Sequence, residues 1–260
     1  MRLPRHEWIV LAGVLLSAAA SAQPPQRDPQ AIVILQRSLA AMGGAVPSDS
    51  LATGNVVLVA GSKTETGTVR ILTRGLHQTA EEILTAEGRR MVVYSQGQAI
   101  ETEDMVIKSL QMELVVTSQC PDFPLPFLAA VLNDPDSGIQ YVGLESFDGS
   151  PVHHIRFWKS FSSKPRRQHL ATFSVKDVWV DAISGLPRKL SYIRRAARGA
   201  EPGIPVEVLY SAYRSVSGLL FPYRIEKSLN GTPWATVTIS SVIFNSGLTD
   251  TDFPIQYGDR

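Results

Sequence analysis

The sequence of 260 residues contains a single cysteine, Cys120, so it cannot form an internal disulfide. Its 25 Lys and Arg residues nearly balance its 24 Asp and Glu residues, and the formal net charge of +1 gives no electrostatic basis for binding nucleic acid. Because 44% of the residues are hydrophobic, the composition does not indicate disorder. These features leave a folded protein whose core and hydrogen bonds stabilise it without disulfides.

Motifs for catalysis and metal binding are also missing. The sequence has no His-Glu-x-x-His zinc motif, no Gly-x-Ser-x-Gly nucleophile motif and no phosphate-binding glycine loop. His153 and His154 are adjacent on an expected strand, where their side chains point to opposite faces and cannot share a metal ion. The carboxylates Glu81 and Glu82 alternate across an expected strand in the same way. We therefore expect no enzyme activity, no metal and no cofactor.

The one long apolar run is at the start of the sequence. Arg2 and Arg5 precede the apolar stretch Trp8 to Ala20, and Ala20-Ser21-Ala22 has the small-residue pattern of a cleavage site. The stretch is short for a transmembrane helix, which needs about 20 apolar residues. We interpret residues 1–22 as a cleaved signal peptide. This predicts export to the periplasm, with the extracellular space as the alternative, and no transmembrane span in the mature chain.

The mature chain is expected to begin with a mobile leader over residues 23–27, followed by a single domain over residues 28–260. An amphipathic helix opens that domain: Asp28 suits the N-cap, Pro29 the first turn and Gly43 the left-handed position that ends a helix. Apolar residues at helical spacing form one stripe along it, namely Ile32, Leu35, Leu39 and Met42.

Most of the remaining sequence predicts antiparallel strands. Short runs rich in β-branched and aromatic residues alternate with Gly, Ser and Asn-Gly turns, and helices do not separate them as they would in parallel βαβ units. One expected hairpin covers residues 138–160 and turns at Asp148-Gly149. The other expected strands cover residues 55–61, 66–74, 77–86, 90–97, 204–216, 219–229 and 233–245.

The segment Lys176 to Arg194 reads as a strand, a tight turn and a strand. Val178 and Val180 are expected on one face, and Trp179 and Asp181 on the other. Asp181 comes just before the turn, where an aspartate often accepts backbone N–H bonds. We therefore assign this aspartate a structural role.

Two short helices are expected in the middle of the chain, over residues 103–117 and 124–135, because apolar residues recur there at helical spacing between prolines and polar residues. Two polar segments, residues 162–170 and 196–203, are expected to be loops. Lys164, Arg166 and Arg167 make the first of them basic.

This order of elements resembles the LolA/LolB lipoprotein-localisation superfamily, which includes the sensor domain of the sigma-factor regulators RseB and MucB. The matching segments are residues 39–44, the strand meander, the central helices and residues 178–192 and 210–226. The resemblance implies an α+β, mainly β fold: a strongly curved antiparallel sheet, or unclosed half-barrel, with an N-terminal helix and central helices packed in its concave face. It also implies an apolar cavity that can hold acyl chains, and Arg70 is nearest to the arginine with which the carriers hold their lid shut.

The favoured hypothesis is a monomeric, exported, non-catalytic protein that binds an acyl chain of a lipid or lipoprotein. An alternative is a protein-binding sensor or envelope-assembly module with an envelope protein as partner and no lipid, and a third is a hydrolase of unknown type. A charge at Leu128 or Val131 should weaken ligand binding more than folding. The candidate cavity residues are Val57, Val59, Val69, Ile71, Val92, Tyr94, Leu110, Leu114, Phe127, Leu128, Val131, Tyr192, Tyr210 and Phe221.

Overall fold

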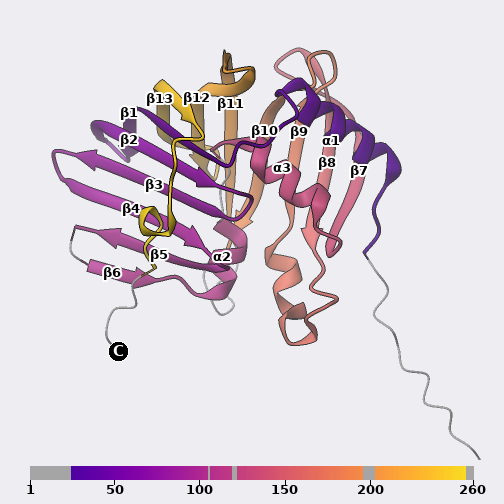
Figure 1. Cartoon of the computed structure of the whole chain (residues 1–260), viewed down its shortest axis with the longest axis horizontal. Coiled ribbons are helices and arrows are strands. Elements are labelled where there is room, and N and C mark those ends of the chain that lie inside the picture. Colours follow the sequence, from indigo (N-terminus) through magenta and orange to yellow (C-terminus); the bar gives the residue numbers. More distant parts are fainter. Residues whose placement is uncertain (1–24, 105, 119–121, 196–202, 256–260) are drawn as a thin grey trace, which may run out of the picture.

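The structure is a computed structural model that describes residues 25–104, 106–118, 122–195 and 203–255. The expected signal peptide, Cys120 and most of the expected loop at residues 196–203 lie outside the described residues. Within the described ranges, 13 strands form one antiparallel sheet in the order β6-β5-β4-β3-β2-β1-β13-β12-β11-β10-β9-β8-β7, and its two edges do not pair (Figure 1). The expected fold class, a mainly β, unclosed antiparallel sheet with a few helices, is confirmed.

The strands have the following bounds. The first half of the sheet contains β1 (Asp49–Ala60), β2 (Lys63–Arg74), β3 (Gln78–Thr85), β4 (Gly88–Ser95), β5 (Gln98–Glu103) and β6 (Val106–Ser109). The second half contains β7 (Ser137–Phe147), β8 (Ser150–Lys159), β9 (Lys176–Asp181), β10 (Pro187–Arg194), β11 (Ile204–Val216), β12 (Leu219–Leu229) and β13 (Thr232–Phe244).

The path of the chain explains why the central helices lie in the connection between the two edges of the sheet. The strands run from β1 in the middle to the edge strand β6, and then resume at the opposite edge with β7 and return to β13, which pairs with β1. The connection between the two edges carries α2 (Met112–Ser118) and α3 (Pro124–Asn133). Helix α1 (Pro29–Ala41) contacts α3 and β7 (Figure 1).

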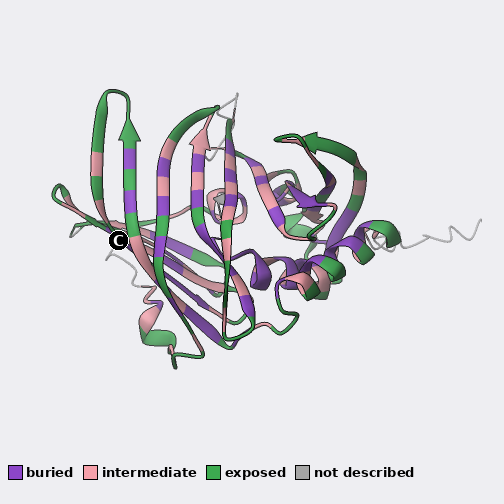
Figure 2. Ribbon diagram, turned by 90° about the horizontal axis from the view of Figure 1, so that it is seen from above, coloured by how far each residue is buried: buried purple, intermediate pink, exposed green. Residues whose placement is uncertain are grey.

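Buried and exposed residues alternate along the strands, and the buried residues form the core. On β12, Phe221, Tyr223 and Ile225 are buried while Arg224 between them is exposed, and Figure 2 shows the same alternation of buried and exposed residues on other strands. Complete burial of a side chain such as Phe221 stabilises the fold by roughly 2 kcal/mol. One large cluster of buried residues therefore joins the sheet to α1 and α3.

The turns and the sheet irregularities follow from local sequence. The expected hairpin turn at Asp148-Gly149 is confirmed, with φ of 53° and 74°, and Asn230-Gly231 has φ of 49° and 75°. Positive φ at both central residues is what a type I′ hairpin turn requires. Register shifts at Thr53/Gly54 and Lys227/Ser228 mark irregular pairing of the kind that bends strands and increases their twist.

The expected helix ends of α1 are confirmed. The Asp28 side chain accepts a hydrogen bond from the backbone N–H of Gln30 at 2.8 Å, and Gly43 has φ of 110°. Arg27, which we assigned to the leader, is bonded to the structure: its guanidinium donates to the carbonyls of Leu132 at 2.7 Å and Asp134 at 2.6 Å. These bonds cap the end of α3 with a positive charge, which suits its dipole.

Two expectations were wrong. The helix expected over residues 103–117 is confined to α2, because residues 106–109 pair with β5 as strand β6; the β-branched Val106 and Ile107 suit a strand as well as a helical stripe. The loop expected over residues 162–170 is largely a 3₁₀ helix, η1 (Pro165–Phe173), which Leu170 anchors with a side chain 1% exposed.

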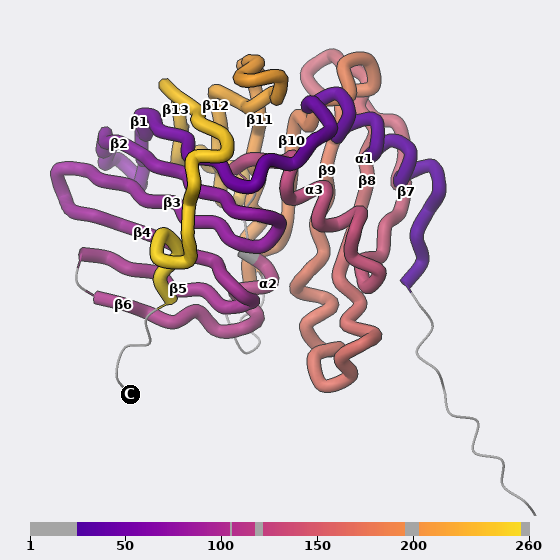
Figure 3. Tube along the Cα trace, in the orientation of Figure 1, coloured from indigo at the N-terminus to yellow at the C-terminus, as the bar shows by residue number. Residues whose placement is uncertain are grey.

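The C-terminal segment after β13 returns over β3 to β5 (Figure 3). It contains a short 3₁₀ turn, η2 (Asp250–Asp252), and its Phe253 packs with Leu72, Val93 and Ile100 in a second, smaller cluster. This segment covers the face of these strands opposite to the main core. No helix in the described ranges is long and apolar enough to span a membrane.

Candidate ligand-binding site

A cavity of about 170 Å³, called here the inner cavity, lies between the concave faces of β2–β5 and β10–β13. Five of the candidate cavity residues line it, namely Ile71, Val92, Tyr94, Leu110 and Tyr192. Five charged residues that were not among the candidates also line it: Glu101 and Arg194, and three ionisable residues joined through Lys227, namely Glu81, Asp122 and Lys227.

These three ionisable residues form a buried ionic cluster. The Lys227 Nζ lies 2.7 Å from Oε2 of Glu81 and 2.9 Å from Oδ1 of Asp122, and the side chains of Lys227 and Asp122 are only 4% and 5% exposed. Burial raises the pKa of the Asp122 carboxyl to about 7; Lys227 opposes that rise, and the nearby Glu81 adds to it. The Asp122 carboxyl is therefore harder to ionise than that of an exposed aspartate.

The positions of the three residues tie the helical connection to the sheet. Glu81 comes from β3 and Lys227 from β12, whereas Asp122 immediately precedes the segment that enters α3. Lys227 occupies an inward position on β12, in step with Phe221, Tyr223 and Ile225. This alternation was visible in the sequence as a lysine on an otherwise apolar strand face.

The inner cavity also has polar atoms available for a ligand. Within the described ranges, Oε1 of Glu81 and Nε1 of Trp234 are buried and have no hydrogen-bond partner, and both residues line this cavity. A buried polar atom left unpaired costs roughly 1–3 kcal/mol. The cavity can thus offer one acceptor and one donor to a bound polar group.

A larger cavity of about 430 Å³, called here the basic cavity, lies between α2, α3, β8, η1 and the turn that joins β4 to β5. Tyr94 lines both cavities. Helix α2 begins just after Leu110, which lines the inner cavity, and its first residue, Met112, lines the basic cavity. Its apolar lining includes Phe127 and Phe157, whose ring centroids are 5.5 Å apart. Three candidate residues lie here: Tyr94, Phe127 and Val131.

The basic cavity is named for its cationic lining. Lys159, Lys164, Arg167 and Lys176 line it, against the single carboxylate of Asp134. Lys159 pairs with Asp134 at 3.2 Å. The buried Lys176 donates to the carbonyl of Val116 on α2 at 3.0 Å, so one of the cations also holds α2 against β9.

The other candidate residues lie elsewhere. Val69, Leu128, Tyr210 and Phe221 are buried in the main core, and Leu114 is half-buried on α2. Val57 and Val59 are 38% and 37% exposed, whereas their neighbours Val56 and Leu58 face the core, a difference of one residue along β1. The ligand-binding roles of all the candidate residues stay predictions.

Arg70 lies on the face of β2 opposite to the inner cavity. It pairs with Glu82 at 2.9 Å and lines a third cavity with Leu72 and the C-terminal residues Thr251 and Asp252. The alternation of Glu81 and Glu82 across β3 is thereby confirmed, since Glu81 faces Lys227 instead. In the described part of the chain, the ion pair between the sheet and the segment leading to α3 is made by Lys227, not by Arg70.

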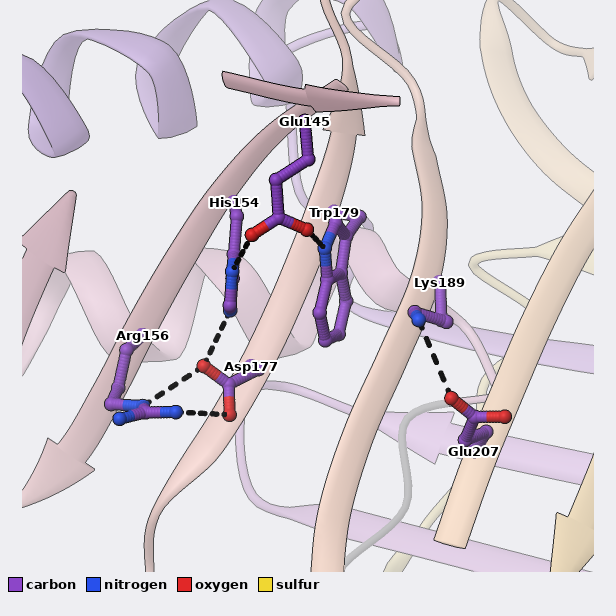
Figure 4. Close-up of polar contacts among 7 residues, drawn as sticks. All are labelled: Glu145, His154, Arg156, Asp177, Trp179, Lys189 and Glu207. Atoms are coloured by element: carbon purple, nitrogen blue, oxygen red, sulfur yellow. Dashed lines mark hydrogen bonds and ion pairs between the residues drawn. The ribbon is translucent and has the colours of Figure 1, made fainter. Parts of the chain in front are cut away.

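A second polar cluster, which sequence reasoning missed, surrounds His154 (Figure 4). Its Nδ1 lies 2.6 Å from Oε1 of Glu145 and its Nε2 lies 2.7 Å from Oδ1 of Asp177, and its ring stacks on Trp179 at 4.3 Å. Both ring nitrogens can donate to these carboxylates only in the imidazolium form. The Trp179 Nε1–H donates to Glu145 and, with His154, holds the pKa of that carboxyl below its ordinary value.

This cluster joins three strands and lines none of the three cavities described here, so we assign it a structural role. Val178 and Val180 on β9 belong to the main core, as predicted, while Trp179 and Asp177 alternate with them along the strand. His153 has a separate partner, the hydroxyl of Tyr141 at 3.2 Å. No group of His, Cys, Asp and Glu suited to a metal ion occurs among the residues that the structure describes.

The structural role of Asp181 is confirmed. Its Oδ1 accepts hydrogen bonds from the backbone N–H groups of Ile183 at 3.1 Å and Ser184 at 2.7 Å. These bonds hold the pKa of the Asp181 carboxyl below its ordinary value against the opposing effect of burial. The aspartate therefore closes the turn between β9 and β10.

Neither a protein-family model nor a curated protein sequence matches the chain. Solved structures do resemble it. A putative outer membrane lipoprotein-sorting protein domain from Vibrio parahaemolyticus has a TM-score of 0.56 at 13% identity, covering 86% of this chain and 96% of that one. A LolA superfamily protein from Nitrosomonas europaea has a TM-score of 0.56 at 16% identity, covering 86% and 97%.

A DUF1329 family protein from Desulfovibrio piger is similar to the same degree, with a TM-score of 0.56 at 11% identity and coverage of 86% and 97%. Sequence identities this low establish the fold alone. The resemblance to the LolA superfamily, drawn from the order of the sequence motifs, is thus confirmed in the structure: the chain has the LolA-type fold.

Proposed function

We propose that the protein is an exported, non-catalytic binding protein that holds an acyl chain of a lipid or lipoprotein between its sheet and its helices. The observation that carries the proposal is a pair of cavities that share Tyr94 in their linings, one inside the sheet and one under α2 and α3. The LolA-type fold supports it by analogy, and so does the expected signal peptide, which directs the protein to the periplasm.

The lining of the cavities suits a flexible apolar chain. Phe127, Val131 and Phe157 line the basic cavity, and Ile71 and Val92 line the inner cavity. Transfer of an acyl chain from water to such surroundings is favourable by about 0.8 kcal/mol per CH₂ group. A chain that ran from one cavity to the other would pass Tyr94 and α2.

The connection that carries α2 and α3 is then the cover of the site. Its polar contacts with the sheet include the ion pair of Asp122 with Lys227, the hydrogen bond from Lys176 to Val116 and the ion pair of Lys159 with Asp134. All three lie beside a cavity, so displacement of this cover would open the cavities to a ligand. A cover held by such polar contacts in addition to its apolar packing can move without disruption of the strand pairing.

The proposal is tested by titration of the purified mature protein with cis-parinaric acid, whose fluorescence rises in apolar surroundings. We expect saturable binding of one molecule per chain and competition by unlabelled palmitate. Binding that does not saturate, or no binding by protein that has been stripped of lipid and refolded, would overturn the proposal.

One observation favours the alternative, a protein-binding module without lipid. Strand β7 is an edge strand, and its Val142 and Leu144 are 44% and 61% exposed. An exposed edge strand is a template for pairing with a partner strand. If an envelope protein co-purifies with the wild type and not with the Val142→Lys, Leu144→Lys variant, while no fatty acid binds, this alternative replaces the proposal.

A further inference from the structure

We propose that the ligand of the basic cavity is an amphiphile with an anionic head, and that Lys164 and Arg167 bind this head. The inference rests on the proposed function, since it names the chemical class of ligand for the same cavity. Its basis is the arrangement of charge at the cavity, which the apolar lining alone does not require.

The first turn of η1 joins these two cations. Lys164 is the N-cap of η1, and the backbone N–H of Arg167, three residues further along, donates to the carbonyl of Lys164 at 2.8 Å. Leu170, three residues later again, is 1% exposed and anchors this side of η1. Arg166 is also exposed and cationic, but it is one residue out of step and does not line the cavity.

Nearby carboxylates are engaged by other groups. Asp134, the only carboxylate among the described residues of the lining, pairs with Lys159 at 3.2 Å and accepts a hydrogen bond from the Ser137 hydroxyl at 3.1 Å. Asp136, close in sequence, accepts hydrogen bonds from the hydroxyls of Ser162 and Ser163. Within the described ranges, Lys164 and Arg167 form no ion pair, so both remain available to an anion.

The positions of charge and apolar surface match the two ends of an amphiphile. Lys164 and Arg167 are exposed, whereas Phe157 and Phe161 in the same lining are 3% and 5% exposed. A carboxylate or phosphate at the exposed side would gain charge-assisted hydrogen bonds from the two cations. The acyl chain would then extend inward along the phenylalanines.

The test compares two ligands that differ only in head charge, cis-parinaric acid and its methyl ester. We expect the wild type to bind the acid about twofold to thirtyfold more tightly than the ester at low salt, since two exposed charge pairs contribute this much. The ratio of the affinities for acid and ester should decrease at high salt because screening weakens exposed ion pairs. It should disappear in the Lys164→Glu, Arg167→Glu variant and persist in the control Arg166→Glu.

The outcomes separate the inference from the proposed function. Equal affinity for acid and ester in the wild type, or an unchanged preference in the double variant, would overturn the inference while the acyl-chain site stands. Displacement of the acid by excess inorganic phosphate would show a site for free anions and would also overturn it. If the wild type binds neither ligand, the proposed function fails first.

Discussion

The Nζ of Lys227 on strand β12 lies 2.9 Å from Oδ1 of Asp122, the residue that precedes the segment leading into α3. Glu81 completes the contact from β3, at 2.7 Å from the same Nζ. A single lysine thus connects two parts of the sheet and the helical cover within the inner cavity. This contact combines a structural role with a position beside the proposed ligand.

Removal of the Lys227 charge should destabilise the fold in a pH-dependent way. Lys227→Met leaves two carboxylates in the cavity without a cation, and loss of one partner of a buried ion pair costs about 3–5 kcal/mol. The loss in the free energy of unfolding should be smaller at pH 5, where protonation of Asp122 removes one of the charges. Urea unfolding at pH 8 and pH 5 measures both values.

Arg224→Met is the matched control for that experiment. Arg224 lies on the same strand and pairs with Glu226 at 2.8 Å, but its side chain is 48% exposed. Exposed pairs contribute roughly 0–1 kcal/mol, so this variant should lose little stability at either pH. A Lys227→Met variant that lost no more than Arg224→Met would contradict the importance of the buried cluster.

Asp122 should make stability depend on pH between about 4 and 7. The folded carboxyl has a pKa of about 7, above the ordinary value of 3.8, so in this interval the folded state holds a proton that the unfolded state has lost. Its contribution to stability is therefore complete below about pH 4 and declines as pH rises to 7, by up to about 1.4 kcal/mol per pH unit.

The Asp122→Asn variant lacks this proton and tests the contribution. The difference in unfolding free energy between wild type and variant should fall steadily from pH 4 to pH 7. Asp136 provides a control, because hydrogen bonds from Ser162 and Ser163 lower its pKa, and Asp136→Asn should give a nearly constant difference over this interval. A constant difference for Asp122→Asn as well would show that its carboxyl titrates normally.

Val131 and Leu128 on α3 should separate ligand binding from folding. Val131 lines the basic cavity, so Val131→Phe should fill part of it and weaken binding of cis-parinaric acid at least about tenfold, with a stability loss of no more than about 1–3 kcal/mol. Leu128 is fully buried outside the cavities, so Leu128→Ala should cost about 2–5 kcal/mol and leave the affinity of the folded protein unchanged.

Titration of each variant with cis-parinaric acid measures its affinity, and unfolding of each variant measures its stability. If Val131→Phe binds the ligand normally, the basic cavity does not hold the acyl chain. If both variants lose stability and affinity together, α3 is a part of the core with no separate role in binding.

His154 should contribute to stability much more than its neighbour Arg156. His154→Ala removes hydrogen bonds to Glu145 and Asp177 and the stacking on Trp179, and bonds to charged groups contribute about 1.5–3 kcal/mol each. Arg156 also bonds to Asp177, but it is 46% exposed, so Arg156→Ala should cost less than about 1 kcal/mol. Thermal unfolding at pH 6 compares them, and equal losses would mean that the His154 contacts contribute little.

Local signals explain why much of the fold was predictable. The cap at Asp28 and the turns at Asp148-Gly149 and Asn230-Gly231 depend on residues adjacent in sequence, and all of them occur as expected. Residues 106–109 were assigned wrongly because their apolar spacing fits both periods, and pairing with β5 decided between them.

The site was less predictable because it depends on contacts between distant residues. The register of β1 determines that Val56 rather than Val57 faces the core, and the sequence pattern of consecutive valines does not distinguish them. Lys227 on β12 and its two partners, Glu81 on β3 and Asp122 before α3, are distant in sequence, and only the curved sheet brings them together. A lysine at an inward strand position was the one local sign of this cluster.

The most direct test of the central claim is native mass spectrometry of the mature protein, expressed with export to the periplasm and purified without detergent, before and after organic extraction. We expect a stoichiometric added mass that disappears on extraction and is identified in the extract as an acyl lipid or lipopeptide. A clean apo mass, together with no uptake of fluorescent fatty acid, would contradict the claim and leave the cavities without an acyl ligand.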